Sequence, residues 1–481
     1  MELEKFMKNI EKLNGNRKYL IFKTMVCSLL EKYLKQQGKE FEKNALTGVD
    51  VYAAQGIDDL ESPTGIEVKF ATLNLDKISE SFKQNAEKKI NSYLIIVAYD
   101  PSAEEKALKC AILKQRLGMN VTIWGLSELK TKIKECKYEL SSNDDENVSK
   151  EYVETTIKEN IDQKDDNVWK DKRNSYITNL HNEYEGDNLV LFLGSGVSRS
   201  CGIPKKDELI TDLFVTLVSN KINSGNVKIT PKDREYLINE INKQKNNGSL
   251  LETSFIRNGL GNEFLQEVPK ALYKNVNKSG LASEPLKSIT KLCLPKRFGI
   301  GIRAVVTYNY DDLTEEAFNE VGIEYKTVVK ENDYPDESKL GVYHINGFIP
   351  KSFKGNINSL NNVLSFNEDE YQDPYAWSIM TQLNFLRDNS CLFIGSSLNN
   401  PKLRRLLEIS STKGEGQKHY AILKKPSIEV KEENKNVCAA FLKANENIQE
   451  QTMMELGVNV IWIEDEKEIP EILDKVKSGI I

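Results

Sequence analysis

The stretch LVLFLGSGVSRSCGIP, residues 189–204, carries the strongest structural signal in this sequence. Its first five residues form an uninterrupted apolar run, which is typical of a strand buried on both faces of a parallel sheet. Gly194 and Gly196 follow at once. Glycines at the end of such a strand let the backbone approach a pyrophosphate, whose charge the next helix can stabilise. Because an ordinary tight turn uses the same residues, the pattern predicts a nucleotide site only if other strand ends match it.

Three further loops of small and polar residues lie at the ends of predicted strands. TYNYDDL (307–313) ends the predicted strand 304–308, HING (344–347) ends 342–345, and GSSLNNP (395–401) follows 391–394. Other strands are expected at 419–423 and 458–463, whereas helices dominate 206–294. Since the carboxyl ends of parallel strands meet at one edge, the four loops should line one site. The sequence thus predicts a doubly wound parallel α/β sheet with a helical insertion at about 206–294.

These loops resemble the sirtuin superfamily, whose pattern is GAGxSxxxGIP, TxNxDxL, HG and GTSLxxxP. The resemblance runs from about residue 188 to the C-terminus and implies a Rossmann-like domain that takes NAD⁺ as its substrate. It implies that Asn309 holds the ribose and positions the attacking group, that His344 is the general base, and that Asp311 contacts the nicotinamide end. It also implies that Gly194, Ser195, Gly196 and Ser198 hold the phosphates, and that Gly395, Ser396 and Ser397 line the adenosine side. Two further cofactor-binding residues that it implies are Ile203 and Pro204.

Departures from the family pattern indicate which of the family's activities to expect. A protein deacylase of this family carries a CxxC…CxxC zinc module. The seven cysteines here form no CxxC pair, so we expect small buried residues, no zinc site and no acyl-lysine recognition. GSG replaces GAG, and HING replaces HG. With these changes, the motifs resemble those of bacterial sirtuin-like domains that hydrolyse NAD⁺ to nicotinamide and ADP-ribose in anti-phage defence. That resemblance implies a homo-oligomer or a defence-system partner protein.

The chemistry of NAD⁺ hydrolysis suits these residue types. Cleavage of the nicotinamide–ribose bond passes through an oxocarbenium-like state, so the site needs one group that positions water and one that accepts a proton near neutral pH. Asparagine and histidine serve these purposes. His181 and His419 match no such motif, and we interpret them as structural residues.

Residues 1–140 predict a separate small α/β domain. We expect two helices within 3–36, strands at 49–53, 65–71, 93–98 and 121–124, and helices at about 76–89 and 104–117. In TGVDVYAAQGIDDLESPTGIEVKF (47–70), strand alternation puts Glu67 and Lys69 on one face. Together with Asp50 they offer two carboxylates for a divalent metal and a lysine that can activate water or stabilise a phosphodiester transition state. The acidic residues at 58, 59 and 61 are expected to lie in a surface loop.

This D…ExK arrangement resembles the PD-(D/E)xK restriction-endonuclease-like family over about residues 1–138. The resemblance implies that Asp50 and Glu67 bind Mg²⁺ or Mn²⁺, that Lys69 is catalytic, and that Glu31 and Gln84 are accessory. Two alternatives stay open: a solvated strand edge with ordinary charges, and the same fold without activity.

Charge and composition set the remaining expectations for this chain of 481 residues, which is 29% charged with a net charge of −6. Residues 1–140 hold 23 Lys and Arg against 20 Asp and Glu, whereas the rest holds 43 against 52, so any DNA or RNA contact is expected in 1–140. The polar segment 141–147 predicts a linker, giving domains at 1–140 and 188–481 joined by 141–187. No apolar run reaches the ~18–20 residues of a membrane span, and no signal peptide is evident, so we expect a cytoplasmic protein without membrane contact.

The preferred hypothesis is NAD⁺ hydrolysis released by infection, with a nuclease-like domain that senses or cleaves nucleic acid. One alternative is a nuclease effector whose sirtuin-like domain only senses a nucleotide. Another is that both domains are interaction platforms in a larger complex.

Overall fold

The computed structural model describes residues 2–13, 16–46, 49–70, 73–75, 78–79, 90–140, 168–223, 228–244, 253–276, 283–331, 333, 335–336, 338–352, 377–411, 418–428 and 435–480. They form two compact units. Unit 1 comprises Met1–Ser175, Leu407–Lys418 and Pro426–Asn459, and unit 2 comprises Tyr176–Leu406, His419–Lys425 and Val460–Ile481. The predicted linker 141–147, most of the predicted helix 76–89 and Gln84 lie outside the described residues.

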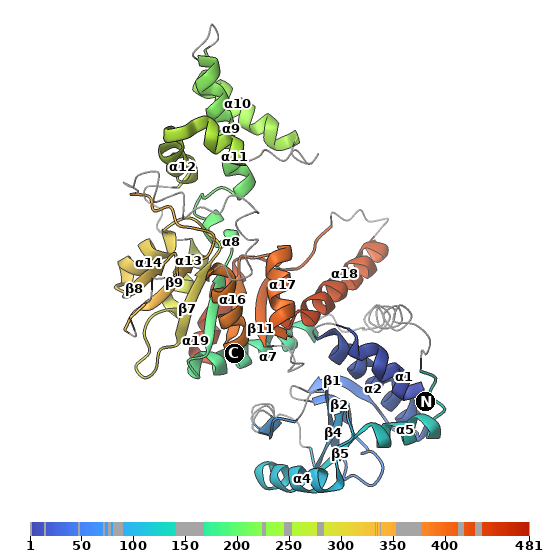
Figure 1. Ribbon diagram of the computed structural model, residues 1–481. Coiled ribbons are helices and arrows are strands. Elements are labelled where there is room, and N and C mark those ends of the chain that lie inside the picture. The colour runs from blue at the N-terminus through green and yellow to red at the C-terminus, as the bar shows by residue number, and fades with distance from the viewer. Residues whose placement is uncertain are drawn as a thin grey trace. The chain divides into compact units, whose positions relative to one another are not determined.

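A parallel sheet of seven strands forms the centre of unit 2 (Figure 1). Its order is β12-β11-β10-β6-β7-β9-β8, and β6 pairs in parallel with both β7 and β10. The sheet predicted from the sequence is therefore confirmed, and all six strands expected in it are present. The short edge strand β8 was not expected. The strands are β6 Leu189–Leu193, β7 Ile302–Thr307, β8 Tyr325–Val328, β9 Leu340–His344, β10 Ser390–Ile394, β11 His419–Lys424 and β12 Val458–Ile463.

Burial explains why these segments are strands. Every residue of β6, β10 and β12 is buried, as expected for strands covered by helices on both faces. The helices that accompany the sheet are α7 Val168–Glu185, α8 Ser195–Arg199, α13 Glu284–Leu292, α14 Leu313–Val321, α16 Trp377–Asp388, α17 Pro401–Ser410 and α19 Glu468–Ser478. Among these, α13 packs against α14 and α19.

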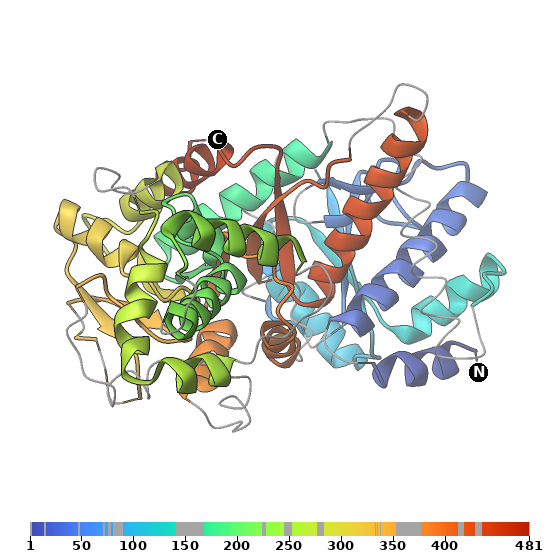
Figure 2. The ribbon, with the colours of Figure 1, turned by 90° about the horizontal axis from the view of Figure 1, so that it is seen from above.

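The predicted helical insertion forms its own group of helices. It contains α9 Lys206–Asn223, α10 Pro231–Gln244, α11 Thr253–Leu260, a short 3-10 turn at Gly261–Glu263, and α12 Phe264–Leu272. Helix α9 contacts α10, α11 and α12. In Figure 1 this group extends from the end of the sheet at which α8 begins, and in Figure 2 it is nearest the viewer, in front of the strands. The insertion therefore lies on the side of the sheet where the four loops are.

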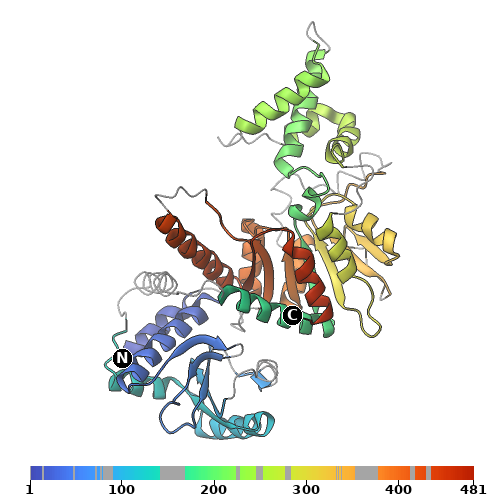
Figure 3. The same ribbon diagram turned by 180° about the vertical axis from the view of Figure 1, so that it is seen from behind.

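The first 140 residues of unit 1 form a five-stranded sheet in the order β1-β2-β3-β4-β5. The pairs β1–β2 and β2–β3 are antiparallel, whereas β3–β4 and β4–β5 are parallel. Apolar side chains of α2 pack against one face and those of α4 against the other. Figure 3 shows this sheet and its helices from behind. The predicted helices and strands are confirmed where they are described, and β1 and α5 are additional. The elements are α1 Glu2–Glu11, α2 Arg17–Gln36, β1 Glu42–Leu46, β2 Val49–Ala53, β3 Thr64–Lys69, β4 Ser92–Val97, α4 Ala103–Leu117, β5 Asn120–Trp124 and α5 Leu126–Glu135.

Unit 1 also contains a long helix from the far end of the chain, α18 Lys435–Glu455. The Asn16 side-chain amide, at the start of α2, donates to the backbone carbonyl of Met454. Beside it, Arg17 lies 3.8 Å from the Glu455 carboxylate. Unit 1 is thus built from segments that lie far apart in the sequence.

The sequence predicts no membrane-spanning segment, and the helices of the structure bear on that prediction. Within the described ranges, no helix combines the length and apolar character that crossing a membrane requires.

Candidate functional site

The glycine loop after β6 packs directly on the loop after β10. The Gly194 amide donates to the Ile394 carbonyl at 2.8 Å, and the Gly196 amide donates to the Gly395 carbonyl at 2.9 Å. A Cβ on Gly194 would lie only 2.4 Å from the Gly395 oxygen, and Gly395 has a φ of +69°, which favours glycine. These glycines therefore bring two backbones together, and their amides are already used within the protein.

Asn309 connects the loop after β7 to that glycine loop. Its side-chain Nδ2 donates to the Gly194 carbonyl at 3.1 Å and to Ser198 Oγ at 2.9 Å. Ser198 Oγ in turn donates to Asp311 Oδ1 at 3.1 Å, and the Leu313 amide donates to the same oxygen at 3.2 Å. All of these side chains are buried. Four of the residues expected in the NAD⁺ site, Gly194, Ser198, Asn309 and Asp311, therefore form one hydrogen-bonded chain.

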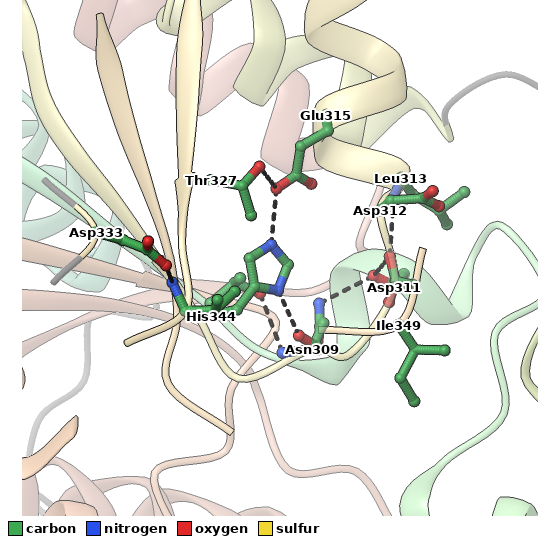
Figure 4. Close-up of polar contacts among 12 residues, drawn as sticks. Asn309, Asp311, Asp312, Leu313, Glu315, Thr327, Asp333, His344 and Ile349 are labelled. Carbon is green, nitrogen blue, oxygen red and sulfur yellow. Dashed lines mark hydrogen bonds and ion pairs between the residues drawn. The ribbon is translucent and has the colours of Figure 1, made fainter. Parts of the chain in front are cut away.

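His344 ends β9 beside Asn309 and is 1% exposed (Figure 4). Its Nδ1 lies 3.0 Å from the Asn309 backbone carbonyl, and its Nε2 lies 2.7 Å from Glu315 Oε1 on α14. Burial alone would lower the pKa of His344, but the Glu315 carboxylate, the Asn309 carbonyl and Asp311 together raise it above its ordinary value. Both ring nitrogens are engaged within the protein.

Asp311 combines burial with an incomplete set of hydrogen bonds. It is 2% exposed, and Oδ2 is buried without a partner among the described residues. Burial raises the pKa of its carboxyl to about 6, while the hydrogen bonds from Ser198 and Leu313 oppose that rise. A buried acceptor without a donor is costly, and at such a site it points to a missing polar partner.

The helical insertion contacts the same group of loops through Tyr273, which directly follows α12. The Tyr273 hydroxyl lies 2.7 Å from Asp312 Oδ1 and 2.7 Å from the Ile349 carbonyl, and it accepts a hydrogen bond from the Asp312 amide. Burial, then the nearby Asp312 charge, raises the pKa of Tyr273 well above its usual range, so the phenol is protonated. Next to it, the carbonyl of Asn275 lies against Gly202 of the glycine loop. The insertion thus contacts both the loop after β7 and the glycine loop.

The other predicted residues differ in accessibility. Ser195, Gly196 and Ser397 are exposed and Ser396 is half-buried, whereas Ile203 packs in the core of unit 2 and Pro204 is half-buried. The two other histidines lie elsewhere: the ring of His181 lies 2.9 Å from the Val476 carbonyl, and His419 accepts a hydrogen bond from the Cys391 amide. Five of the seven cysteines are buried, as expected.

In unit 1 the predicted nuclease residues lie around a cluster of charges. Asp50 Oδ2 accepts from the Val68 amide at 2.7 Å, and its Oδ1 lies 2.5 Å from Lys23 Nζ of α2. Glu67, 6% exposed, forms an ion pair with Lys69 and accepts a hydrogen bond from the buried hydroxyl of Tyr93. Glu67 and Lys69 therefore share a face, as strand alternation predicts.

The charges of this cluster bear on the role of its lysines. Burial alone would lower the pKa of Lys69, but Glu67, with Tyr19 and Asp50, raises it above its ordinary value. The pKa of Lys23 is raised in the same way, with Asp50 as the main opposing charge. Burial, then Asp50, raises the pKa of Tyr19 to about 12. A lysine that holds its proton can stabilise a phosphodiester's charge but cannot serve as a base.

The carboxylates fit a divalent cation in part. Mg²⁺ is usually held by one or two carboxylates together with phosphate oxygens and water, which Asp50 and Glu67 could supply. Within the described residues, however, no group of three or more His, Cys, Asp or Glu side chains could hold a metal on its own. Glu31, an expected accessory residue, forms ion pairs with Lys35 and Lys43.

Sequence reasoning missed four residues of these two sites. Glu315 is an acidic residue in the first turn of a helix, where such residues are common for dipole reasons alone. Tyr273 comes from a segment without a motif. Tyr93 is the second residue of an apolar strand. Lys23 carried the one usable signal, because it interrupts the buried residues of α2, lying between Phe22 and Met25.

Comparison with known proteins supports a sirtuin-like region in the C-terminal part of the chain. No curated protein matches the chain. The family model of the SIR2-like domain matches residues 303–449, a range that includes Asn309, His344 and Gly395. The glycine loop at 194–204 precedes that range, and the hydrogen bonds of Asn309 connect the two. Because of this match, the C-terminal part of this chain contains a sirtuin-like domain. SIR2-like domains use NAD⁺.

Proposed function

We propose that the C-terminal domain hydrolyses NAD⁺ to nicotinamide and ADP-ribose. The observation that carries this proposal is the pair of hydrogen bonds from Asn309 to Gly194 and Ser198, which join the SIR2-like region to the glycine loop. The unpartnered oxygen of Asp311 beside them supports a ligand that brings a hydrogen-bond donor, such as the carboxamide of nicotinamide.

In the proposed reaction the bond between ribose C1′ and the nicotinamide nitrogen breaks, and its electron pair returns to the pyridine ring. A water oxygen forms the new bond to C1′, and one water proton leaves. Asn309 would hold the ribose hydroxyl and orient the water. His344 would accept the proton, and the net products are nicotinamide, ADP-ribose and a proton.

We further propose that this activity serves anti-phage defence by depleting NAD⁺ in an infected cell. A soluble cytoplasmic chain, held inactive in a homo-oligomer or by a partner protein, fits that role. The helical insertion would transmit control, because Tyr273 and Asn275 contact the loops of the site.

For unit 1 we propose a nuclease-like domain that senses or cleaves DNA or RNA. The supporting observation is the convergence of Asp50, Glu67 and Lys69, with Lys23 beside them. Asp50 and Glu67 would hold Mg²⁺ or Mn²⁺, which would supply charge stabilisation to a phosphodiester. Lys69 would contribute a further positive charge. If residues 1–140 bind nucleic acid through phosphates, affinity should fall steeply as salt rises, as anisotropy of labelled DNA and RNA would measure.

The decisive experiment measures nicotinamide release by the purified full-length protein, with and without DNA, RNA or candidate nucleotides. The double variant Asn309→Ala, His344→Ala should release almost none, whereas His181→Gln, which changes a histidine outside the site, should match the wild type. Release by the double variant at the wild-type rate under activating conditions would overturn the proposal. NAD⁺ binding without turnover, together with metal-dependent nucleic-acid cleavage, would favour the alternative in which the sirtuin-like domain is only a sensor. Neither activity under any condition would favour two interaction platforms.

A further inference from the structure

The hydrogen bonds of the His344–Glu315 pair determine how many protons the pair carries. His344 Nδ1 faces a backbone carbonyl, which only accepts hydrogen bonds, so Nδ1 must carry a proton. Nε2 lies 2.7 Å from a carboxylate oxygen, so a second proton lies between them. The pair therefore holds two protons, and the ring has no free lone pair in this state.

The surroundings of Glu315 fix where the second proton resides. Glu315 is 4% exposed, and its side chain forms an ion pair with His344. Thr327 Oγ1 donates to the same oxygen, Oε1, at 3.2 Å, whereas Oε2 is buried and has no partner among the described residues. A buried carboxylate is stabilised by a cation in direct contact, and the imidazolium of His344 is such a cation.

We propose that Glu315 is a positioning residue of the site: its carboxylate anchors Nε2 of the His344 ring and keeps a proton there, so that Nδ1 is the ring nitrogen that exchanges protons during the reaction. This inference rests on the proposed NAD⁺ hydrolysis. In the structure both ring nitrogens of His344 carry a proton, so the ring cannot yet act as a base. Nδ1 must first release its proton to solvent and leave the Asn309 carbonyl; it can then accept the proton of the attacking water.

Other ionisable groups also interact electrostatically with this pair. Asp311, on the loop after β7, acts on His344 in the same direction as Glu315. Tyr325, on β8, is affected first by its own burial, which raises its pKa, and also by Glu315 and Asp312. Phe348 packs against the ring at 4.4 Å between centroids and carries no charge. Glu315 is the only one of these groups in direct contact with a ring nitrogen, so its removal should have the largest effect.

A direct test uses the ring nitrogens, because the chain contains only three histidines. In protein labelled with ¹⁵N-histidine, the three rings can be assigned by substituting His181 and His419 in turn. At about pH 7.5, above the ordinary pKa of ~6.5, the His344 ring should show two protonated nitrogens. In Glu315→Gln, which keeps the shape and an acceptor oxygen, the ring should become neutral at this pH. The matched control Glu316→Gln removes a charge one residue further along α14 and should leave His344 unchanged.

Activity then separates this inference from the proposed function. If His344 is the base, the rise of NAD⁺ hydrolysis with pH should move to lower pH in Glu315→Gln. If the ring nitrogens respond as described but the pH profile does not move, the role of Glu315 stands and the base role of His344 fails. A wild-type His344 that is neutral at about pH 7.5, or one unaffected by Glu315→Gln, overturns the inference whatever the activity. Because the wild-type spectrum alone can give that result, the test does not depend on the variant folding.

Discussion

The side-chain amide of Asn309 lies 3.1 Å from the carbonyl of Gly194, 115 positions earlier in the chain. Its other donor contact reaches Ser198, so a single asparagine connects a loop inside the SIR2-like region with a loop outside it. Position 309 therefore has both a structural and a proposed catalytic role, and variants there have to be compared with a neutral control.

Asn309→Ala is expected to lower NAD⁺ hydrolysis by roughly 10²–10⁴-fold, the usual range for removing a positioned catalytic group. A methyl group can neither hold the ribose hydroxyl nor orient water. Asn239→Ala, on the exposed surface of α10, provides a control that should change turnover only slightly. Nicotinamide release by both variants, measured beside their NAD⁺ affinity, would check this; equal losses in the two variants would argue against a specific role of Asn309.

Gly194→Val should weaken NAD⁺ binding itself rather than the chemical step. The added Cβ would approach the Gly395 oxygen to 2.4 Å, so the two loops must separate. Gly194→Ala adds only that Cβ and should show a milder form of the same effect. Calorimetric NAD⁺ titration of both variants tests the expectation, and wild-type affinity in Gly194→Val would contradict it.

Asp311→Asn should stabilise the unliganded protein at neutral pH. Because burial raises the pKa of this acid to about 6, from an ordinary 3.8, the folded state binds its proton more tightly than the unfolded chain does. Its contribution to stability is therefore most favourable below about pH 4 and is lost as the pH rises to about 6. The shift corresponds to at most about 3 kcal/mol. Thermal melts at about pH 3.5 and 7.5 should show the gain only at the higher pH. The exposed Asp388 on α16, changed to Asn, should show no such difference.

Tyr273→Phe should lower the free energy of unfolding by about 1–3 kcal/mol, because Asp312 and the Ile349 carbonyl lose their shared hydroxyl partner in a buried setting. Tyr236 on α10 is 64% exposed in the same insertion, so Tyr236→Phe is the matched control and should be neutral. Denaturant unfolding of both variants gives the comparison. If Tyr273→Phe is also neutral, the insertion is not tied to the site through this residue.

Lys69→Ala should abolish cleavage of DNA or RNA in the presence of Mg²⁺ or Mn²⁺ while the domain stays folded. The reason is that a raised pKa keeps this lysine charged beside Glu67, where it can stabilise a phosphodiester transition state. Lys130→Ala removes a surface lysine as a control. Plasmid nicking assays with each metal provide the measurement, and a wild-type protein that never cuts would end the nuclease hypothesis.

The sequence was most informative where a signal was local. The apolar run before Gly194 and the loops at Asn309 and Gly395 lie within single strand ends, and the parallel sheet brings them together by its topology alone. Contacts of side chains without a motif were out of reach. Glu315 meets His344 from 29 positions away, and Tyr273 meets Asp312 from 39, so neither pair leaves a periodic pattern. The edge strand β8 was missed because it has only four residues, of which one is buried.

The membership of α18 in unit 1 has a consequence for the order of events during synthesis. Asn16 leaves the ribosome 438 residues before Met454, whose carbonyl it contacts. At a typical 5–20 residues per second, that interval is roughly 20–90 s. During this interval, the side chains of Asn16 and Arg17 cannot make their contacts with α18, because that helix has not yet been synthesised. A newly made chain therefore completes its first unit only after almost all of its second has been translated, which makes the N-terminal helices a natural place for a chaperone to bind the nascent protein.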